Sequence, residues 1–242
     1  MCTNYRAPGE DPGISELRLG LIDLWKRTPW EPEIWPEYAA PIVRADGDAA
    51  AAAIANFGMI PKAHQPPGKK YLTVNARAET VGEKPAYRAA WRAGQRCLIP
   101  AAWIYEPNWE TGKHVRYRIG LADWQPLCVA GVWRAWKGPD GGETLAMAML
   151  TVNADEHPVM KHMHRLGDEK RSVVILRPAD YDEWLHTKNV DAARAMLQHD
   201  IQQRHRQPRL YSLVQRRAVA VTSGAPCFSI SAVKLGSRSM FE

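Results

Sequence analysis

Six short segments rich in β-branched and aromatic residues follow one another through the middle of the chain, and this series constrains the fold most strongly. Turn-forming stretches such as Gly138–Gly142 separate them, as is typical of strands joined by short turns. The segments are Tyr71–Glu79, Cys97–Tyr105, His114–Gly120, Leu127–Trp133, Leu145–Asn153 and Ser172–Leu176. The middle of the chain is therefore predicted to form an antiparallel β meander.

Helical patterns lie on either side of this meander. Ile14–Lys26 carries apolar residues at helical spacing, and Pro29 ends the pattern. Two further helices are predicted after the strands, over Pro178–His186 and Val190–His199. The predicted fold class is α+β, a single domain over residues 1–242 with a mainly antiparallel, barrel-like β core and peripheral α-helices.

The alanine-rich run Ala49–Ala55 leaves two alternatives open. Alanine has the highest helix propensity, which favours a helix. The run lies between the turn residues Gly47 and Gly58, however, and neighbouring strands would draw so short a segment into a sheet. His64–Lys70 combines proline, glycine and lysine and is predicted to be a polar loop.

Composition and charge narrow the choice of partner and compartment. The formal net charge of +6 favours an anionic partner without identifying it. No run of 18 apolar residues occurs and Met1–Arg27 lacks the build of a signal peptide, so a cytoplasmic protein without membrane contact is expected. Cys97, Cys128 and Cys227 are widely spaced in apolar surroundings, which indicates buried thiols in a reducing compartment and no disulfide or zinc framework.

Cys2 directly follows the initiator methionine, so loss of Met1 would make it an N-terminal 1,2-aminothiol. Such a group closes on one aldehyde carbon as a five-membered thiazolidine ring. Its amine, with a pKa of about 7.7 to 8.0, is partly unprotonated and nucleophilic at neutral pH. The alternative is an ordinary residue in a frayed terminus.

Polar side chains alternate with small apolar ones in the predicted strand around Asn75, Arg77 and Glu79. Period two places all three on one strand face, which is either a solvated face or a site. As a site, it would offer an amide that orients a reacting group beside a guanidinium that holds a phosphate.

Glu106 lies between Tyr105 and Pro107 at the end of an apolar segment. A carboxyl group in such surroundings tends to have a raised pKa, which suits a general acid or base near neutral pH. The alternative is that the strand simply reaches water there. Glu110, four residues further on in a more polar stretch, is the weaker candidate.

Three histidines, His157, His162 and His164, cluster in one polar segment. His-x-His spacing can ligate a metal from a strand, but no acidic or thiol ligand cluster stands nearby in the sequence, so neither a metal nor another cofactor is predicted. A histidine beside Arg165 is better interpreted as a proton shuttle or as a satisfied loop residue.

Four motifs occur in a particular order along the chain: Met1-Cys2, VNARAET at 74–80, RCLIPAAWIYE at 96–106 and Met160-x-x-Met163-His164. Together they resemble the SRAP family, the SOS-response-associated peptidase-like proteins, which protect abasic sites in single-stranded DNA by cross-linking to them. Supporting patches are YAAP at 38–41, GMIP at 58–61 and AGVWRAW at 130–136. The resemblance covers about residues 1–185, whereas 204–242 diverges apart from a possible strand over Leu210–Val214.

The resemblance implies a set of roles. Met1 is lost, and the amine and thiol of Cys2 form a thiazolidine with the abasic-site aldehyde. Asn75 positions the Cys2 terminus, Glu106 shuttles protons and His164 assists the sugar and imine chemistry. The implied contacts to DNA come from a further set of residues: Arg77, Thr151, Arg165 and Pro41. The implied partner is single-stranded DNA containing abasic sites, bound by a monomer without a cofactor.

Three departures from the family pattern bear on these roles. Family members commonly continue Met-Cys-Gly-Arg, but this chain has Thr3-Asn4, so a phosphate-binding arginine is missing. The loop after Pro61 carries lysines where tryptophans are common. The segment after His164 is longer than usual, which leaves His162 as a rival for the catalytic histidine.

Two alternative functions remain open from the sequence. Cysteine, histidine and a carboxylate or amide also suit a cysteine-type peptidase, acting at minimum on its own Met1. A purely non-covalent module that binds single-stranded DNA would make Cys2 irrelevant.

Overall fold

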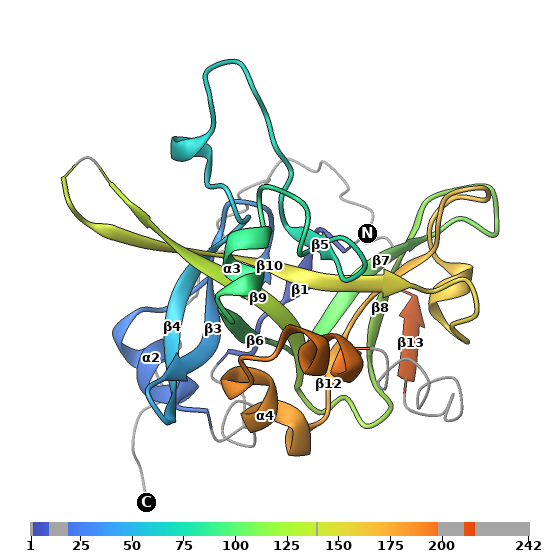
Figure 1. Cartoon of the computed structure of the whole chain (residues 1–242). Coiled ribbons are helices and arrows are strands. Elements are labelled where there is room, and N and C mark those ends of the chain that lie inside the picture. Colours follow the sequence, from blue (N-terminus) through green and yellow to red (C-terminus); the bar gives the residue numbers. More distant parts are fainter. Residues whose placement is uncertain (1, 10–18, 139, 198–210, 216–242) are drawn as a thin grey trace, which may run out of the picture.

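A closed ring of five strands forms the centre of the molecule (Figure 1). The computed structural model describes residues 2–9, 19–138, 140–197 and 211–215. The ring runs β10-β4-β3-β6-β9 and closes because β9 also pairs with β10. Its strands are β3 (Ala39–Asp46), β4 (Ala49–Phe57), β6 (Arg96–Ala101), β9 (Leu127–Lys137) and β10 (Glu143–Asn153). The predicted α+β fold with a barrel-like core is confirmed.

Buried residues of β6, β9 and β10 fill the barrel with side chains. All six residues of β6 are buried, and so are the first six of β9. Gly131 on β9 lies opposite Cys97, where an added Cβ would come within 2.7 Å of the Ile99 side chain and 2.8 Å of the Cys97 sulfur. This glycine therefore makes room for the side chains that fill the barrel.

The pairing is not purely that of an antiparallel meander. β10 runs parallel to β4 and to β5 (Asn75–Arg77), and these pairs join segments far apart in the chain. β11 (Arg171–Val173) and β12 (Ile175–Leu176) extend the sheet antiparallel to β10 and β9. A pattern of hairpin turns predicts pairing between strands that are neighbours in the sequence. It therefore does not reveal these parallel pairs.

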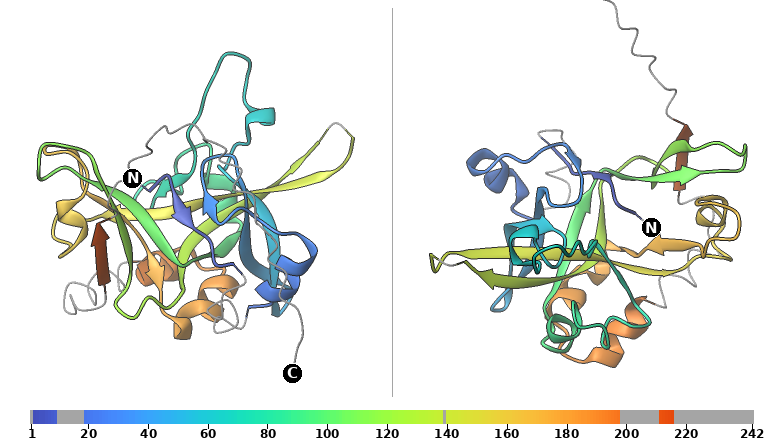
Figure 2. Two further views of the ribbon diagram at one scale, coloured as in Figure 1. Left: turned by 180° about the vertical axis from the view of Figure 1, so that it is seen from behind. Right: turned by 90° about the horizontal axis from the view of Figure 1, so that it is seen from above.

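A second sheet, ordered β13-β8-β7-β1-β2, packs beside the barrel (Figure 2). It consists of β1 (Tyr5–Arg6), β2 (Glu33–Ile34), β7 (Trp103–Asn108), β8 (Val115–Leu121) and β13 (Tyr211–Gln215). β1 lies between β7 and β2, so the N-terminal segment is an interior strand and not a frayed end. β13 corresponds to the strand suggested over Leu210–Val214.

Two segments differ from a simple propensity expectation. Ala49–Ala55 belongs to strand β4, because it pairs with β3 along its whole length and this tertiary pairing outweighs the helix propensity of alanine. Cys97–Tyr105 is divided into β6 and β7, which belong to different sheets. The break falls at Ala102, whose amide donates to the carbonyl of Arg6.

The helices are short and peripheral (Figure 1). α2 (Leu21–Arg27) accounts for the second half of the predicted Ile14–Lys26 helix; residues 14–18 lie outside the described residues. α3 (Arg88–Arg92) was not predicted, whereas α4 (Tyr181–His186) and the helical residues 190–197 were. Among the described residues, three 3-10 turns complete the elements: η1 (Lys62–His64), η2 (Met160–His162) and η3 (Pro178–Asp180).

Packing connects these elements to the barrel. Trp184 of α4 is fully buried and donates its indole N–H to the carbonyl of Cys97 at 3.0 Å. Cys97 and Cys128 are buried free thiols, as predicted, while Cys227 lies outside the described residues. In the part of the chain that the structure describes, no helix is both long and apolar enough to cross a membrane.

We predict that Gly131→Ala lowers the free energy of unfolding by about 1–3 kcal/mol, because the new methyl group overpacks the barrel against Ile99 and Cys97. Urea denaturation measures the change. Gly9→Ala is the matched control, since a Cβ at Gly9 meets nothing within 4 Å. Equal stability of the two variants would contradict the assigned packing.

Candidate active site

Cys2 is held in the interior by the strand that follows it. The amide of Tyr105 donates to the carbonyl of Asn4 at 3.0 Å, and the Asn4 side-chain amide donates to the carbonyl of Ile34 at 2.9 Å. The Cys2 side chain is 1% exposed, and its thiol donates to the Asn4 carbonyl at 3.4 Å. Burial, reinforced by the negative charge of Glu106, raises the pKa of this thiol well above its usual range.

Asn75 reaches the chain terminus from β5. Its side-chain amide donates to the carbonyl of Cys2 at 2.7 Å. Two contacts fix the backbone of Asn75. Its carbonyl accepts a hydrogen bond from the Tyr87 hydroxyl at 2.9 Å, and its strand pairs with β10 at Met149. Residues 73 positions apart are thus joined at the peptide group between Cys2 and Thr3.

Glu106 projects from β7 into the same interior and is 1% exposed. Burial raises the pKa of its carboxyl group to about 7, although the positive charge of the N-terminus and an interaction with the Cys2 thiol act in the opposite direction. The carboxyl group therefore exchanges a proton near neutral pH, as general acid–base chemistry requires.

His164 completes the cluster, with its Nε2 atom 3.5 Å from a carboxylate oxygen of Glu106. Its backbone is in the left-handed region at φ 64°. Three hydrogen bonds hold this conformation: its amide donates to the Pro107 carbonyl at 2.7 Å, and Lys170 Nζ donates to the carbonyls of His164 and Arg165. Burial lowers the pKa of His164 to about 4.

The pKa values of Glu106 and His164 are thus reversed from their usual order. A buried ion pair loses more solvation than its attraction recovers unless further hydrogen bonds surround it, so the neutral forms are favoured. Around pH 5 to 6 the proton of the pair is held by the carboxyl group, leaving a neutral imidazole beside it.

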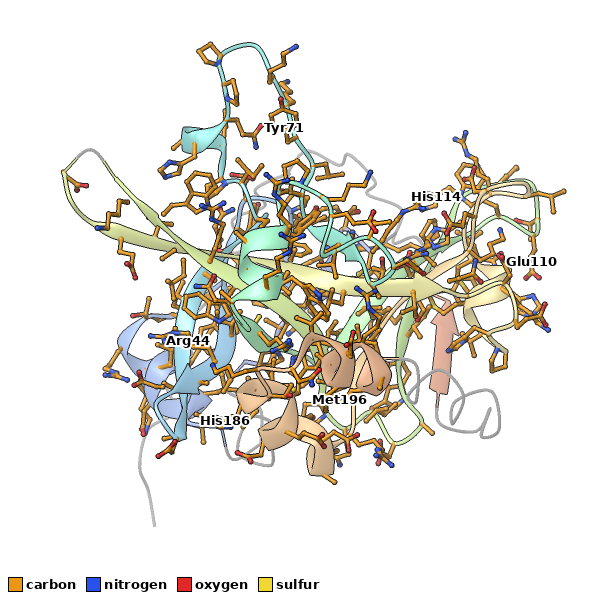
Figure 3. The ribbon with its side chains drawn as sticks, viewed as in Figure 1. Arg44, Tyr71, Glu110, His114, His186 and Met196 are labelled. Carbon is orange, nitrogen blue, oxygen red and sulfur yellow. The ribbon has the colours of Figure 1, made fainter. Side chains whose placement is uncertain are left out.

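The other two histidines are held elsewhere. His162 is half exposed, and its Nδ1 atom lies 2.7 Å from a carboxylate oxygen of Glu110, which Figure 3 places at the edge of the molecule. The Nδ1 atom of His157 accepts hydrogen bonds from the backbone amides of Val159 and Met160, so this histidine caps a loop. The structure therefore brings His164, and not His162, to Glu106.

No metal centre is apparent around these histidines. Within the ranges described above, no three His, Cys, Asp or Glu side chains come together in a way that would hold a metal ion.

Two of the predicted DNA contacts lie at the surface. The Arg77 side chain is 49% exposed and forms an ion pair with Glu169 at 2.7 Å. Arg165 is exposed, with its guanidinium 4.5 Å from the centre of the Trp109 ring. Glu79, expected on the face of Asn75 and Arg77, instead lies beyond the end of β5 and pairs with Arg171.

The other two predicted DNA contacts, Thr151 and Pro41, are buried. The Thr151 hydroxyl accepts from Arg171 at 3.2 Å and donates to the Ala76 carbonyl at 3.5 Å, so it joins neighbouring strands. Pro41 lies in the buried part of β3. Direct contact of these two side chains with DNA is therefore no longer expected, because neither reaches the surface.

A groove of about 640 Å³ leads away from Asn75 and Arg77. Its walls include Tyr71, which Figure 3 shows near the base of the protruding loop, and Trp136, on which the His64 ring stacks at 4.5 Å between ring centres. Lysines were expected to replace aromatic side chains in this region. The groove is in fact partly aromatic, because Trp136 comes from the distant β9 strand.

Arg116 occupies the neighbourhood of the missing arginine at position 4. It comes from β8, donates to the side-chain oxygen of Asn4 and pairs with Glu33. Its guanidinium lies 3.6 Å from the centre of the Tyr105 ring. Sequence reasoning missed this residue, since only the pairing of β8 with β7 brings it near the terminus.

The sequence and the fold that carry this cluster are similar to those of known proteins. The family model of SOS response associated peptidase (SRAP) matches residues 1–216. The chain belongs to the SRAP family. The match continues past residue 185, where the motif resemblance ends, and takes in the β13 strand.

Named relatives share part of the chain. The abasic site processing protein YoqW of Bacillus subtilis is 32% identical over 136 residues, which are 56% of this chain and 57% of that protein. The abasic site processing protein HMCES of Xenopus tropicalis is 28% identical over 140 residues, 50% of this chain and 42% of that protein. This SRAP chain thus spans only about half the length of the relatives that it matches.

Solved structures share the fold over most of the chain. A protein from Bordetella bronchiseptica is 30% identical with a TM-score of 0.75, covering 89% of this chain and all of that one. A protein from Bacteroides thetaiotaomicron, 16% identical, has a TM-score of 0.64 over 90% of this chain and 93% of that one. The latter likeness concerns the fold alone.

We predict that Glu106→Gln changes how stability depends on pH. A carboxyl group whose pKa is raised in the folded state binds more protons there than in the unfolded state, so it loses stability as pH rises from about 4.5 through about 7. Relative to the variant, the wild type should lose on the order of 3 kcal/mol of unfolding free energy between pH 4.5 and pH 8.

Urea denaturation of both proteins across this pH range measures the difference, in which the titration of shared groups largely cancels. Glu110→Gln serves as the control, because the pKa of this exposed carboxyl is lowered, first by its hydrogen bond from Asn108. A constant difference between wild type and Glu106→Gln would show that Glu106 titrates as an ordinary carboxyl group.

Proposed function

We propose that this SRAP protein senses abasic sites in single-stranded DNA and forms a covalent thiazolidine cross-link through Cys2 after loss of Met1. Relatives that bear the name abasic site processing protein support the abasic-site partner. The observation that carries the proposal is the hydrogen bond from Asn75 to the Cys2 carbonyl, next to the buried pair of Glu106 and His164.

The first step is hydrolysis of the Met1–Cys2 peptide bond, in which one water is consumed and methionine leaves. The freed α-amine and the Cys2 thiol then stand on adjacent carbons. Asn75 keeps the Cys2 carbonyl in place through its 2.7 Å hydrogen bond, so the new terminus stays in the interior beside Glu106. Positioning of this kind replaces an encounter of two separate molecules by a local reaction.

Condensation follows at the aldehyde of the ring-opened deoxyribose. The Cys2 amine adds to the aldehyde carbon, and the resulting carbinolamine loses water to give an imine. Glu106, with a pKa of about 7, gives a proton to the departing hydroxyl and takes protons back in other steps. His164 is neutral at this pH and serves as the adjoining proton acceptor.

Ring closure makes the product stable. The Cys2 sulfur adds to the imine carbon, while the thiol proton goes by way of Glu106 to the imine nitrogen. The sum is aldehyde plus aminothiol giving thiazolidine plus one water, without an oxidant or reductant. A thiol whose pKa is raised by burial keeps its proton until the imine forms, which favours this order of steps.

Arg77 and the adjoining groove support binding of a DNA strand next to the reacting terminus. The half-exposed guanidinium suits a phosphate, and the aromatic walls at Tyr71 and Trp136 suit bases that are not paired. Recognition of this kind is independent of base sequence, because phosphates and aromatic stacking carry little sequence information.

Cleavage of peptides other than the bond to Met1 fits the site less well. Cysteine peptidases attack with a thiolate whose pKa is lowered by a neighbouring positive charge. Here burial and Glu106 raise the pKa of the thiol instead. The proposed peptidase activity is therefore confined to the protein's own first peptide bond.

We predict that the mature protein, incubated with single-stranded DNA bearing one abasic site, gives an adduct that survives denaturing electrophoresis. Cys2→Ser should give only an imine that borohydride must trap, because its amine survives without a thiol. Glu106→Ala and His164→Ala should slow adduct formation by tenfold or more, roughly in the range of general acid–base effects. Intact mass measurement confirms loss of Met1 in each protein.

His162→Ala is the matched control for His164→Ala, because its ring faces Glu110 and not Glu106. It should react at the wild-type rate. A wild type that binds the DNA without forming an adduct would favour the non-covalent module, and a stable adduct formed by Cys2→Ser would contradict the role of sulfur.

We also predict that Arg77→Ala weakens non-covalent binding of single-stranded DNA several-fold and makes it less dependent on salt, because a phosphate contact is lost. Fluorescence anisotropy at several salt concentrations measures both effects. Arg92→Ala, which removes an equal charge from an exposed position on α3, should change binding less. Equal effects of the two variants would mean that only net charge matters.

A further inference from the structure

Glu169 connects the surface arginine of the site with a buried one. One of its carboxylate oxygens lies 2.7 Å from Nη2 of Arg77, and the other lies 2.9 Å from Nη1 of Arg171. The Arg171 side chain is only 3% exposed, whereas the Arg77 side chain is 49% exposed. Glu169 thus stands between the interior network and the guanidinium that faces the groove.

Arg171 does not depend on Glu169 for its charge balance. Glu79 binds the same guanidinium through both oxygens, at 3.0 and 2.8 Å, and the Thr151 carbonyl accepts from it at 2.7 Å. One carboxylate already neutralises this buried cation. The charge of Glu169 is consequently available to neutralise Arg77, for which no other ion pair is seen among the described residues.

The backbone next to Glu169 is anchored. Lys170 donates its ammonium group to the carbonyls of Arg165 at 2.7 Å and His164 at 3.2 Å. Glu169 itself is 37% exposed, so its carboxylate remains accessible to solvent and to a competing anion. The segment between His164 and β11, whose unusual length is evident from the sequence, thereby presents a carboxylate at a defined place on Arg77.

We infer that Glu169 occupies the place on Arg77 that a DNA phosphate takes, so that strand binding proceeds by exchange of a carboxylate for a phosphate. This inference rests on the proposed function of the groove. Carboxylate and phosphate compete for one guanidinium because both accept its parallel N–H groups. Glu169 thereby weakens non-covalent binding of undamaged strands. A damaged strand is retained instead by its covalent bond to Cys2.

The test measures non-covalent binding of a single-stranded oligonucleotide without an abasic site, by fluorescence anisotropy at several salt concentrations. Glu169→Gln keeps the shape of the side chain and removes its charge, so it should tighten binding about threefold to tenfold and steepen the salt dependence. Asp168→Asn removes the same charge one residue away, in a side chain with no ion pair among the described residues, and should change binding less than about twofold.

A double-variant cycle links the effect to Arg77. In an Arg77→Ala background, Glu169→Gln should tighten binding no more than Asp168→Asn does, because the paired guanidinium is absent. Thermal unfolding of every variant establishes that Arg171 keeps its network through Glu79. Tighter binding that persists in the Arg77→Ala background would overturn the exchange, as would an equal effect of Asp168→Asn.

The remaining outcomes separate this inference from the proposed function. Binding by the wild type with no gain from Glu169→Gln overturns the role of Glu169 alone. Binding that appears only in Glu169→Gln supports the exchange in its strongest form. No binding by either protein overturns the groove as a DNA site and the inference with it.

Discussion

The hydrogen bond from the Asn75 side chain to the Cys2 carbonyl is the contact on which the candidate site depends. It joins the segment that leads into β1 of one sheet to β5, a strand paired with the barrel. An N-terminal residue is usually mobile, and a reactive amine on a mobile end gains little from neighbouring acids and bases. By fixing the carbonyl group of Cys2, Asn75 turns a chain end into a positioned reactant.

The burial that holds Cys2 also sets the proton chemistry around it. Glu106 and His164 share an interior that disfavours separated charges, so the carboxyl group keeps a proton up to about pH 7 while the imidazole stays neutral. A carboxyl group at the surface would be ionised throughout this range. The fold therefore supplies a proton donor at neutral pH by excluding water from the Glu106 carboxyl group.

Sequence patterns predicted the local features of this arrangement well, and its long-range features poorly. The strand-like segments and the choice of Glu106 and His164 as site candidates follow motifs that can be read along the chain, whereas the burial of Glu106 and its pairing with His164 come from the structure. The strand at Ala49–Ala55 and the parallel pairs of β10 depend on partners distant in sequence, which outweigh local propensity.

The same reason explains which site residues were missed or misplaced. Arg116, Trp136 and Glu169 acquire their places through pairing across sheets and through an anchored loop, so no spacing along the chain marks them. The resemblance implied that Thr151 contacts DNA, but the pairing of β10 with β5 and the contact with Arg171 hold its side chain in the interior.

Charge compensation is the principle common to the inner and outer parts of the site. Inside, Glu106 is neutralised by a proton and not by a cation; outside, Arg77 is neutralised by Glu169 and not by solvent ions alone. The proposed reaction uses Glu106 in this protonated state, whereas an incoming phosphate must displace Glu169 from Arg77. The site therefore favours a ligand that supplies both an aldehyde for Cys2 and a phosphate for Arg77. An abasic nucleotide within a strand carries both groups, whereas a free aldehyde or an intact strand carries only one.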